Sequence, residues 1–362
     1  MVALLGIEEE YLIVDPVSRA VAPRAAEVLA AATELQDLSH EITRFQIEAR
    51  TPPSANLFEV GERLRGARRE VARAARDCGL AVVASGIPVL GDVVPAPLSD
   101  DARYEQGRVL YRALQDEISI CALHVHVDVP DPEHAVYVGN HLRPWLPTII
   151  ALAANSPFFV GRDTGYASWR VISWSRWPVS GAPPYFADYS DYQRAVATLS
   201  ESGALMDAKT VFWDTRPSPK LPTVEIRVAD VPLDVNDSLV LVGLIRALVV
   251  TALAAVTRGD LGPPVASEVL RAAYWRAARD GVFGSGLDLL HGGGLVPGRA
   301  LACQLLEHVR QALAEAGDLE FVEEGLELLT LRGSGAVRQR RAHAWGGGLA
   351  GVVDDLIEAT VA

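Results

Sequence analysis

Residues Cys121–Val129 read CALHVHVDV, and from position 123 onward their side chains alternate between apolar and ionisable types. One face holds a leucine and three valines, and the other holds His124, His126 and Asp128. An alternation of period two is typical of a β-strand that packs one face against a core. The segment therefore predicts a strand whose second face carries ionisable side chains.

Three further segments show the same alternation: Leu4–Val14, Thr43–Thr51 and Thr223–Asp230. Their polar faces carry mainly acids and arginines, namely Glu8, Glu10, Gln46, Glu48, Arg50, Glu225 and Arg227, with Ala229 on the last of them. Glu9 is an acid on the mainly apolar face of the first segment. Strands with one apolar face are typical of an antiparallel sheet covered by helices on one side. We therefore expect an α+β fold in a single domain, residues 1–362.

Helical periodicity separates these strands. It predicts helices over Ala25–Leu38, Leu57–Cys78, Ala135–Asn155, Asp188–Ser202, Val235–Arg258, Ser267–Asp280, Gly298–Ala316 and Leu349–Thr360. The glycine-rich segment Gly281–Gly298 is predicted to act as a lid.

The chain has 362 residues and a formal net charge of −13, so we expect no nucleic-acid partner. Three cysteines without paired spacing favour a reducing compartment, and no signal peptide is expected. Residues Leu239–Val256 are nearly all apolar, but Arg246 in their middle favours a buried core helix over a membrane span. We therefore expect a cytoplasmic protein without a membrane partner.

The acids of the polar faces repel one another if their strands are neighbours, and a divalent cation would relieve that repulsion. A face that is merely solvated is the alternative. Many carboxylates and no thiolate favour Mg²⁺ or Mn²⁺ over Zn²⁺, although the pair His124 and His126 would permit zinc. Arg227 and Arg216 would suit a phosphate beside the metal. The chain contains no P-loop and no Rossmann glycine motif.

The segment GIEEEY at residues 6–11 resembles the opening strand of the bacterial glutamate–cysteine ligase type 2 family, the YbdK-like carboxylate–amine ligases. Further segments are similar in the order that the family has them: Glu41 with Gln46–Glu48, His124–Val127, Asn155–Pro157, Gly161–Arg170, Trp213–Ser218, Pro222–Asp230, Trp275–Gly281 and Gly333–Arg340. The resemblance covers nearly the whole chain.

This resemblance implies a glutamine-synthetase-like catalytic fold with a curved antiparallel sheet. It implies ATP, Mg²⁺ and activation of the glutamate γ-carboxylate as an acyl phosphate before an amine attacks. By position it implies metal ligands at Glu8, Glu10, Glu48, His126 and Glu225. Glu48, Arg227 and Arg216 would be catalytic, with the two arginines at the phosphates of ATP or at the substrate carboxylate. Arg170, Trp169 and Arg279 would bind substrate.

The expected partners are therefore a small-molecule carboxylate and an amine, with a homodimer as the expected assembly. The sequence leaves the amine open. The family often carries Asn just before the Trp275 block, where this chain has Tyr274, and the stretch Trp169–Tyr185 is rich in aromatic residues. Both features favour an amine larger than cysteine. Alternatives are a metal-dependent amide hydrolase using His124 and His126, and a non-catalytic sensor of amino acids or nucleotides.

Overall fold

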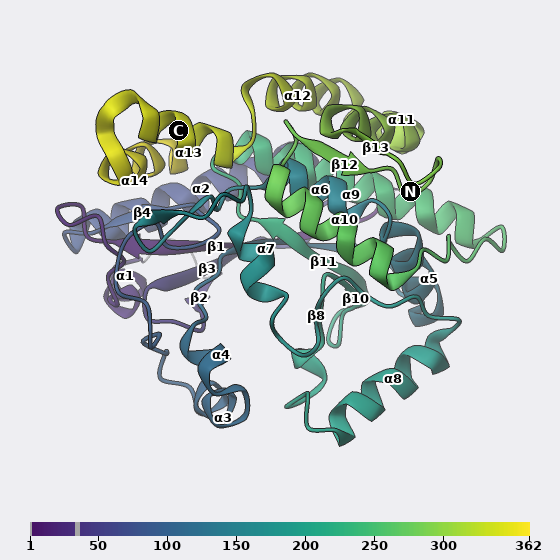
Figure 1. Ribbon diagram of the computed structural model, residues 1–362, viewed down its shortest axis with the longest axis horizontal. Coiled ribbons are helices and arrows are strands. Elements are labelled where there is room, and N and C mark those ends of the chain that lie inside the picture. The colour runs from purple at the N-terminus through teal and green to yellow at the C-terminus, as the bar shows by residue number, and fades with distance from the viewer. Residues whose placement is uncertain (1, 33–36) are drawn as a thin grey trace.

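The computed structural model describes residues 2–32 and 37–362. Its central element is a seven-stranded sheet in which every described pair of neighbours is antiparallel (Figure 1). The strands follow the order β10 (Thr215–Pro217), β11 (Thr223–Asp230), β5 (Ala122–Asp128), β1 (Leu5–Val14), β3 (Gln46–Arg50) and β2 (Leu38–His40), with β4 (Ala81–Val83) also paired to β1. The predicted α+β class and antiparallel sheet are confirmed.

Helices account for most of the remaining chain. They are α1 (Ala25–Ala31), α2 (Leu57–Asp77), α3 (Ala102–Tyr111), α4 (Ala113–Asp116), α5 (Pro132–Leu142), α6 (Leu146–Ala153), α7 (Trp169–Trp174), α8 (Tyr189–Glu201), α9 (Val235–Val256), α10 (Ser267–Asp280), α11 (Gly298–Ala316), α12 (Leu319–Arg332), α13 (Gly335–Ala342) and α14 (Gly348–Thr360), with a 3₁₀ turn at Ala208–Thr210 and a π-turn at His343–Gly347. Short strand pairs are β6 (Phe158–Phe159) with β7 (Arg162–Asp163), β8 (Ser180–Gly181) with β9 (Phe212–Trp213), and β12 (Ser285–Leu287) with β13 (Leu295–Pro297).

The main helical layer packs on one face of the sheet. The apolar side chains of β1, β5 and β11 form one core with α2, α5, α6 and α9, and α11 and α12 pack outside that layer. In Figure 1, α2, α6, α9, α11 and α12 lie above the sheet and α5 lies beside it, while α3, α4 and α8 lie below it. The polar faces of the strands thus look away from the main helical layer.

Glu9, the acid on the apolar face of β1, is fully buried in a network of charge-assisted hydrogen bonds. Its carboxylate accepts hydrogen bonds from Nε and Nη2 of Arg68 on α2 at 2.9 and 2.8 Å. Ser238 of α9 and Tyr11 also donate to it, each at 2.6 Å. The buried carboxylate therefore ties the central strand to two helices of the layer above it.

Two helix predictions need correction. The segment Ala135–Asn155 forms two helices, α5 and α6, because Pro144 has no amide hydrogen to donate within a continuous helix. The predicted helix Ala25–Leu38 ends at Ala31, and residues 33–36 lie outside the described part of the chain. Helices α3, α4, α7, α12 and α13 lie outside the predicted helical ranges. The predicted lid Gly281–Gly298 contains the hairpin of β12 and β13, which packs against α10 and α11.

A β-bulge in β11 corrects the predicted faces of the fourth strand. Ile226 pairs with Val125, but Ala229 pairs with Leu123, so one extra residue stands in β11 between them. The extra residue reverses the alternation. Ala229, predicted on the polar face, therefore lies opposite an apolar-face residue, and Asp230 takes the polar parity instead.

Among the described residues, one helix is long and apolar enough to cross a membrane, and it is α9. In its most apolar window of 18 residues, 72% of the residues are buried inside the protein. Its Arg246 forms an ion pair with Asp318 and donates a hydrogen bond to the carbonyl of Ala55 at 2.6 Å. This burial agrees with the predicted core helix.

Candidate active site

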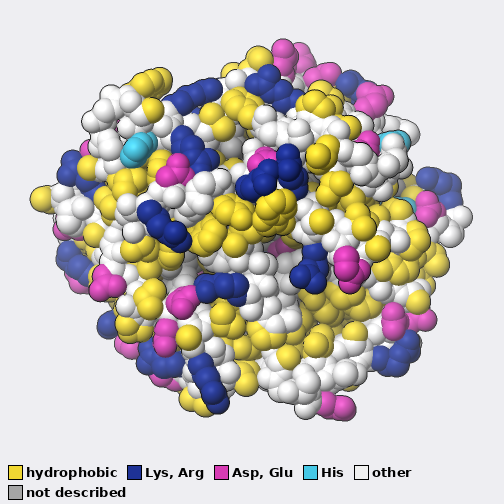
Figure 2. Space-filling view, viewed as in Figure 1, with side chains coloured by type: hydrophobic (Ala, Val, Ile, Leu, Met, Phe, Trp, Pro, Cys, Tyr) yellow, Lys and Arg dark blue, Asp and Glu magenta, His cyan; other side chains and the backbone are white. Residues whose placement is uncertain are grey.

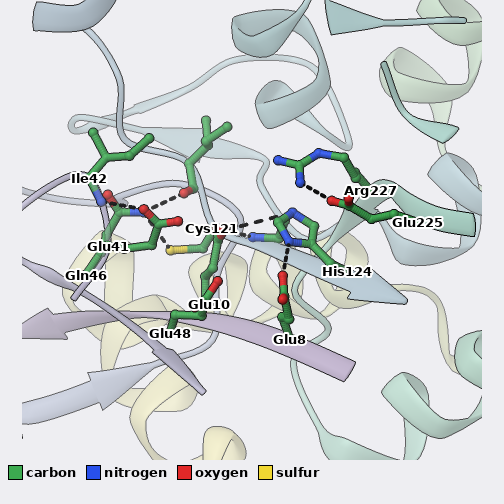
Figure 3. Close-up of polar contacts among 12 residues, drawn as sticks. Glu8, Glu10, Glu41, Ile42, Gln46, Glu48, Cys121, His124, Glu225 and Arg227 are labelled. Atoms are coloured by element: carbon green, nitrogen blue, oxygen red, sulfur yellow. Dashed lines mark hydrogen bonds and ion pairs between the residues drawn. The ribbon is translucent and has the colours of Figure 1, made fainter. Parts of the chain in front are cut away.

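The strand registers gather the predicted acids on one face of the sheet. Glu8 of the central strand β1 lies opposite His124 of β5, and Glu10 lies opposite Glu48 of β3. On the other side of β5, His126 pairs with Glu225 of β11. Figure 3 shows the side chains of Glu8, Glu10, Glu48, His124 and Glu225 on this one face of the strands. Residues far apart in sequence are therefore neighbours because the alternation keeps their parity equal.

Glu8, Glu48 and His124 form the first group that could hold a metal ion, because their ligand atoms lie within 4.8 Å of one another. Nδ1 of His124 lies 3.0 Å from the Glu8 carboxylate. Burial and the charge of Arg227 lower the pKa of His124 to about 4, so its imidazole is neutral at physiological pH. When Nδ1 donates to Glu8, the lone pair of Nε2 is available to a cation.

Glu10, Glu41 and Glu48 form the second group, and it consists of carboxylates only. Burial and the neighbouring charge of Glu48 raise the pKa of Glu10 to about 8. Burial and the charge of Glu8 raise the pKa of Glu48 to about 6. The pKa of Glu41 is also raised well above its ordinary value, by burial and by the charges of Glu10 and Glu48. The repulsion expected from the sequence is thus present, and a divalent cation would relieve it.

Glu225 lies apart from both groups because two arginines hold it. Arg216 donates from Nε and Nη2 at 2.9 and 3.3 Å, and Arg227 forms a second ion pair. Burial alone would raise the pKa of Glu225, but the charges of Arg227 and Arg216 lower it. Arg216 also donates to the carbonyl of Lys209 at 2.9 Å, whereas the buried Nε of Arg227 has no partner.

The structure places His126 differently from its predicted role. Its Nδ1 lies 3.0 Å from the hydroxyl of Thr223 and its Nε2 lies 3.7 Å from Glu8. Neither three-residue group contains it, and the neighbouring imidazole of His124 stands in the first group instead. Glu41 was missing from the predicted ligands because it precedes the predicted strand Thr43–Thr51, where alternation assigns no face. Its only sequence signal was its place in the family resemblance.

The guanidinium of Arg170 binds the backbone of β11 at its bulge. Its guanidinium donates to the carbonyls of Arg227 at 3.0 Å and of Val228 at 3.3 Å, and it lies 3.8 Å from Asp230. Helix α7 is fixed there because Ser168, which caps it, donates to Asp230 at 2.8 Å. Arg170 therefore joins the arginine side of the site to a large cavity beyond α7.

The other two predicted substrate residues lie elsewhere. The ring of Trp169 packs edge-on against Tyr166, and the Arg162 guanidinium lies 5.7 Å from its centre. Arg279 pairs with Asp280, and its guanidinium lies 4.6 Å from the ring centre of Trp275. Neither residue lines the cavity beside Arg170.

Two cavities flank the acidic groups. The larger, about 580 Å³, lies between α7 and α10, and Arg170, Trp174, Asp214, Tyr274 and Trp275 are among its lining residues. The smaller, about 160 Å³, borders Glu41 and is lined by the aromatic side chains Tyr104, Tyr111, Trp174, Trp177 and Phe212. The site thus combines carboxylates that could bind a metal, arginines that could bind phosphate, and two adjoining cavities that could hold substrates. This combination suits a reaction that joins two substrates with the help of a metal and a phosphate donor.

Comparison with known proteins gives concordant matches. The model of a family described as glutamate-cysteine ligase family 2 matches residues 4–355. A protein of Nocardia farcinica (strain IFM 10152) assigned the name glutamate–cysteine ligase 2-1 is 44% identical over 360 residues, which are 99% of this chain and 93% of the relative. A protein of Mycobacterium sp. (strain KMS) assigned the name glutamate–cysteine ligase 2-2 is 42% identical over 361 residues, 99% of this chain and 98% of the relative.

Among solved structures, the glutamate–cysteine ligase of Francisella tularensis in complex with AMP superposes with a TM-score of 0.72. The superposition covers 99% of this chain and 88% of that one, at 12% sequence identity. Such a likeness shows a shared fold, and it agrees with the fold expected from the sequence.

Proposed function

The chain belongs to glutamate-cysteine ligase family 2, and on that premise we propose that it uses ATP to couple the side-chain carboxylate of glutamate, or of a closely similar acid, to an amine. The protein is accordingly a carboxylate–amine ligase that forms a C–N bond.

The observation that carries this proposal is the pair of acidic groups that share Glu48. Glu8, Glu48 and His124 would hold one cation, and Glu10, Glu41 and Glu48 a second. Ligands that are mostly carboxylate oxygens suit Mg²⁺ or Mn²⁺. Bound there, such cations would neutralise the phosphate charge of ATP and polarise the phosphoryl group in transfer.

The two arginines have different tasks. Arg216 is saturated by Glu225 and by backbone carbonyls, so we assign it the positioning of Glu225. Arg227 shares that carboxylate but keeps an unpartnered Nε, so it has a donor left for a substrate oxygen. We therefore propose that Arg227 binds the reacting carboxylate or the transferred phosphoryl group, with Glu225 fixing its orientation.

The proposed reaction has two steps. A carboxylate oxygen of the donor attacks the γ-phosphorus of ATP, the bond to the bridging oxygen breaks, and ADP leaves. The amine nitrogen then attacks the carbonyl carbon of the acyl phosphate, so that a C–N bond forms and the C–O bond to phosphate breaks. The protons that the nitrogen loses pass to the departing phosphate and to solvent.

An amide hydrolase is the second candidate, because His124 with Glu8 and Glu48 would also accept zinc. The all-carboxylate group of Glu10, Glu41 and Glu48 disfavours it, since zinc sites generally use nitrogen or sulfur ligands. A sensor without catalysis would have no use for so many repelling carboxylates.

The test is a measurement of ADP and phosphate release with glutamate, ATP, Mg²⁺ and hydroxylamine as a small acceptor. We expect γ-glutamyl hydroxamate in step with ADP, and complete loss of both products with a chelator. Glu48→Gln should lower the rate by about 100-fold or more, whereas Glu62→Gln on exposed α2 surface should not change it. Amide hydrolysis without nucleotide would establish the hydrolase instead.

A further inference from the structure

The 580 Å³ cavity lies on the side of the site where β8, α7 and α10 meet. Figure 2 shows this face of the molecule hollowed near its centre, with hydrophobic and basic side chains around the hollow. The cavity adjoins the proposed catalytic groups through Arg170, which binds the backbone carbonyl of Arg227. A ligand in it would therefore lie next to the reacting centre.

Two lining side chains hold buried donors without a partner: Nε of Arg170 and Nε1 of Trp174. These residues are only 2% and 4% exposed. A buried donor without a hydrogen bond is unfavourable, so such groups usually await a partner. Two of them beside one cavity favour a ligand with acceptor oxygens, such as a carboxylate. The hydroxyl of Tyr274, by contrast, interacts with the carboxylate of Asp214 on the same wall.

The charges of the wall restrict the ligand further. Asp214, 3% exposed, lies on the wall with the exposed Glu268, and both carboxylates would repel a polyphosphate. A buried carboxylate attracts an ammonium group. Arg170 and the exposed Arg271 provide positive charge on the same wall. The combination suits a zwitterion, with its ammonium group at Asp214 and its carboxylate at the donors.

The remaining wall is aromatic. Trp174, Tyr274 and Trp275 line the cavity, and Trp275 is 44% exposed although it is a large apolar side chain. Its ring is held in place, because its Nε1 donates to the hydroxyl of Tyr166 at 3.1 Å and Arg279 lies over it. Because this aromatic wall is already ordered, a ligand whose apolar surface covers it gains binding affinity without the cost of ordering the side chains.

We propose that this cavity binds the amine substrate, and that this amine is an α-amino acid with an aromatic or large apolar side chain rather than cysteine. The inference rests on the proposed ligase function and names the acceptor class for it. A cavity of about 580 Å³ lies in the range that encloses ligands of drug size. Cysteine would leave most of the aromatic wall uncovered.

The test compares tryptophan, phenylalanine and cysteine as acceptors for the full chain with saturating ATP, Mg²⁺ and glutamate. We expect kcat/KM for an aromatic amino acid to exceed that for cysteine by about tenfold or more. Tryptamine and phenethylamine, which lack the carboxylate, should be poorer than the parent amino acids. Binding of phenylalanine without ATP, measured by calorimetry, gives a readout that is independent of turnover.

Three variants test whether the lining residues of the cavity determine the preference for an aromatic amino acid. Trp275→Leu and Asp214→Asn should raise the KM and the Kd of the aromatic amino acid by about tenfold. Tyr274→Phe removes only the hydroxyl beside Asp214 and should raise the Kd of the aromatic amino acid by less than Asp214→Asn does. The KM of glutamate should stay unchanged in all three. Trp345→Leu is the matched control, since Trp345 is 85% exposed and outside the cavity.

The outcomes separate the two proposals. Cysteine as the best acceptor, or a raised KM for glutamate in these variants, would overturn the assignment of the cavity while hydroxamate formation kept the ligase function intact. Absence of hydroxamate and ADP with hydroxylamine would remove the ligase function and this inference together.

Discussion

Glu48 and Glu225 lie on the same face of the sheet, but their neighbours give them opposite electrostatic environments. Glu48 shares its surroundings with Glu8, Glu10 and Glu41, and its pKa is raised to about 6 by burial and by the charge of Glu8. Glu225 is held by two arginines that lower its pKa. Neutral substitutions at the two positions should therefore affect stability in opposite directions.

We expect Glu225→Gln to lower the free energy of unfolding by about 3 kcal/mol, because Arg216 and Arg227 are left buried without their counter-charge. Glu48→Gln should leave stability unchanged or raise it, because it removes a repelling charge. Chemical denaturation of both variants without metal measures the difference. Equal destabilisation of the two variants would mean that repulsion among the acids has been misjudged.

The acidic groups also predict how the stability of the metal-free protein depends on pH. The pKa values of about 8 for Glu10 and about 6 for Glu48 both lie above the ordinary value of 4.5. Between the ordinary pKa of 4.5 and these raised values, the folded state therefore binds more protons than the unfolded state. The free energy of unfolding falls as the pH rises through that range. Melting temperatures in chelator should decrease from about pH 5.5 to about pH 8.5.

Two comparisons test whether Glu10 and Glu48 cause this decrease in melting temperature. Glu48→Gln should flatten the decrease, because the carboxylate that raises the pKa of Glu10 is gone. Saturating Mg²⁺ should flatten it in the unmodified protein, because the cation replaces the protons. A melting temperature that rises over the same window would contradict the assigned charges.

At the scale of elements, the buried pair of Glu9 and Arg68 joins the central strand to the helical layer. Arg68→Ala should lower the free energy of unfolding by about 3–5 kcal/mol, because the fully buried carboxylate of Glu9 loses its counter-charge. Arg63→Ala on the same helix is the matched control. Its ion pair with Glu59 is exposed, so the loss should stay below about 0.5 kcal/mol. Similar losses in both variants, measured by urea denaturation, would refute the role given to the buried pair.

Strand alternation was sufficient to predict the elements that carry the site. It put Glu8, Glu10, Glu48 and His124 on one face, and the observed registers bring these residues together. The prediction from alternation fails where the backbone departs from regular strand geometry. The bulge after Ile226 has no sequence mark of its own, and so Ala229 was given the wrong face.

Residues outside the strands were harder to predict. Glu41 lies in the connection between β2 and β3, where spacing assigns no direction, and it is seen as part of an acidic group only in three dimensions. No helix is predicted from the sequence at Trp169, but Trp169–Trp174 form the short helix α7. Helical geometry directs Arg170 and Trp174 to the cavity and Trp169 to Tyr166. The positions of Trp169 and Trp174 on α7 therefore decide which of them lines the cavity.

Across the whole molecule, one face of the sheet contributes to the stability of the fold and the opposite face carries the candidate active site. One face packs against α2, α5, α6 and α9, and the other holds the acidic groups between two cavities. Ligands that bind only the folded state should therefore stabilise the entire chain. Mg²⁺ with a non-hydrolysable ATP analogue at about 100 times its Kd should add about 2.7 kcal/mol to the free energy of unfolding. Glu48→Gln should lose this gain, and an undiminished gain in that variant would place the metal elsewhere.

We propose above all that the donor carboxylate is activated as an acyl phosphate at the acidic face of the sheet. The most direct measurement uses glutamate labelled with ¹⁸O in its γ-carboxylate, together with ATP, Mg²⁺ and an amine acceptor, and follows the label by mass spectrometry. We expect one labelled oxygen per turnover in inorganic phosphate, with ADP as the other product, because the carboxylate oxygen attacks the γ-phosphorus. Label in AMP, or no label in any phosphate product, would contradict this proposal.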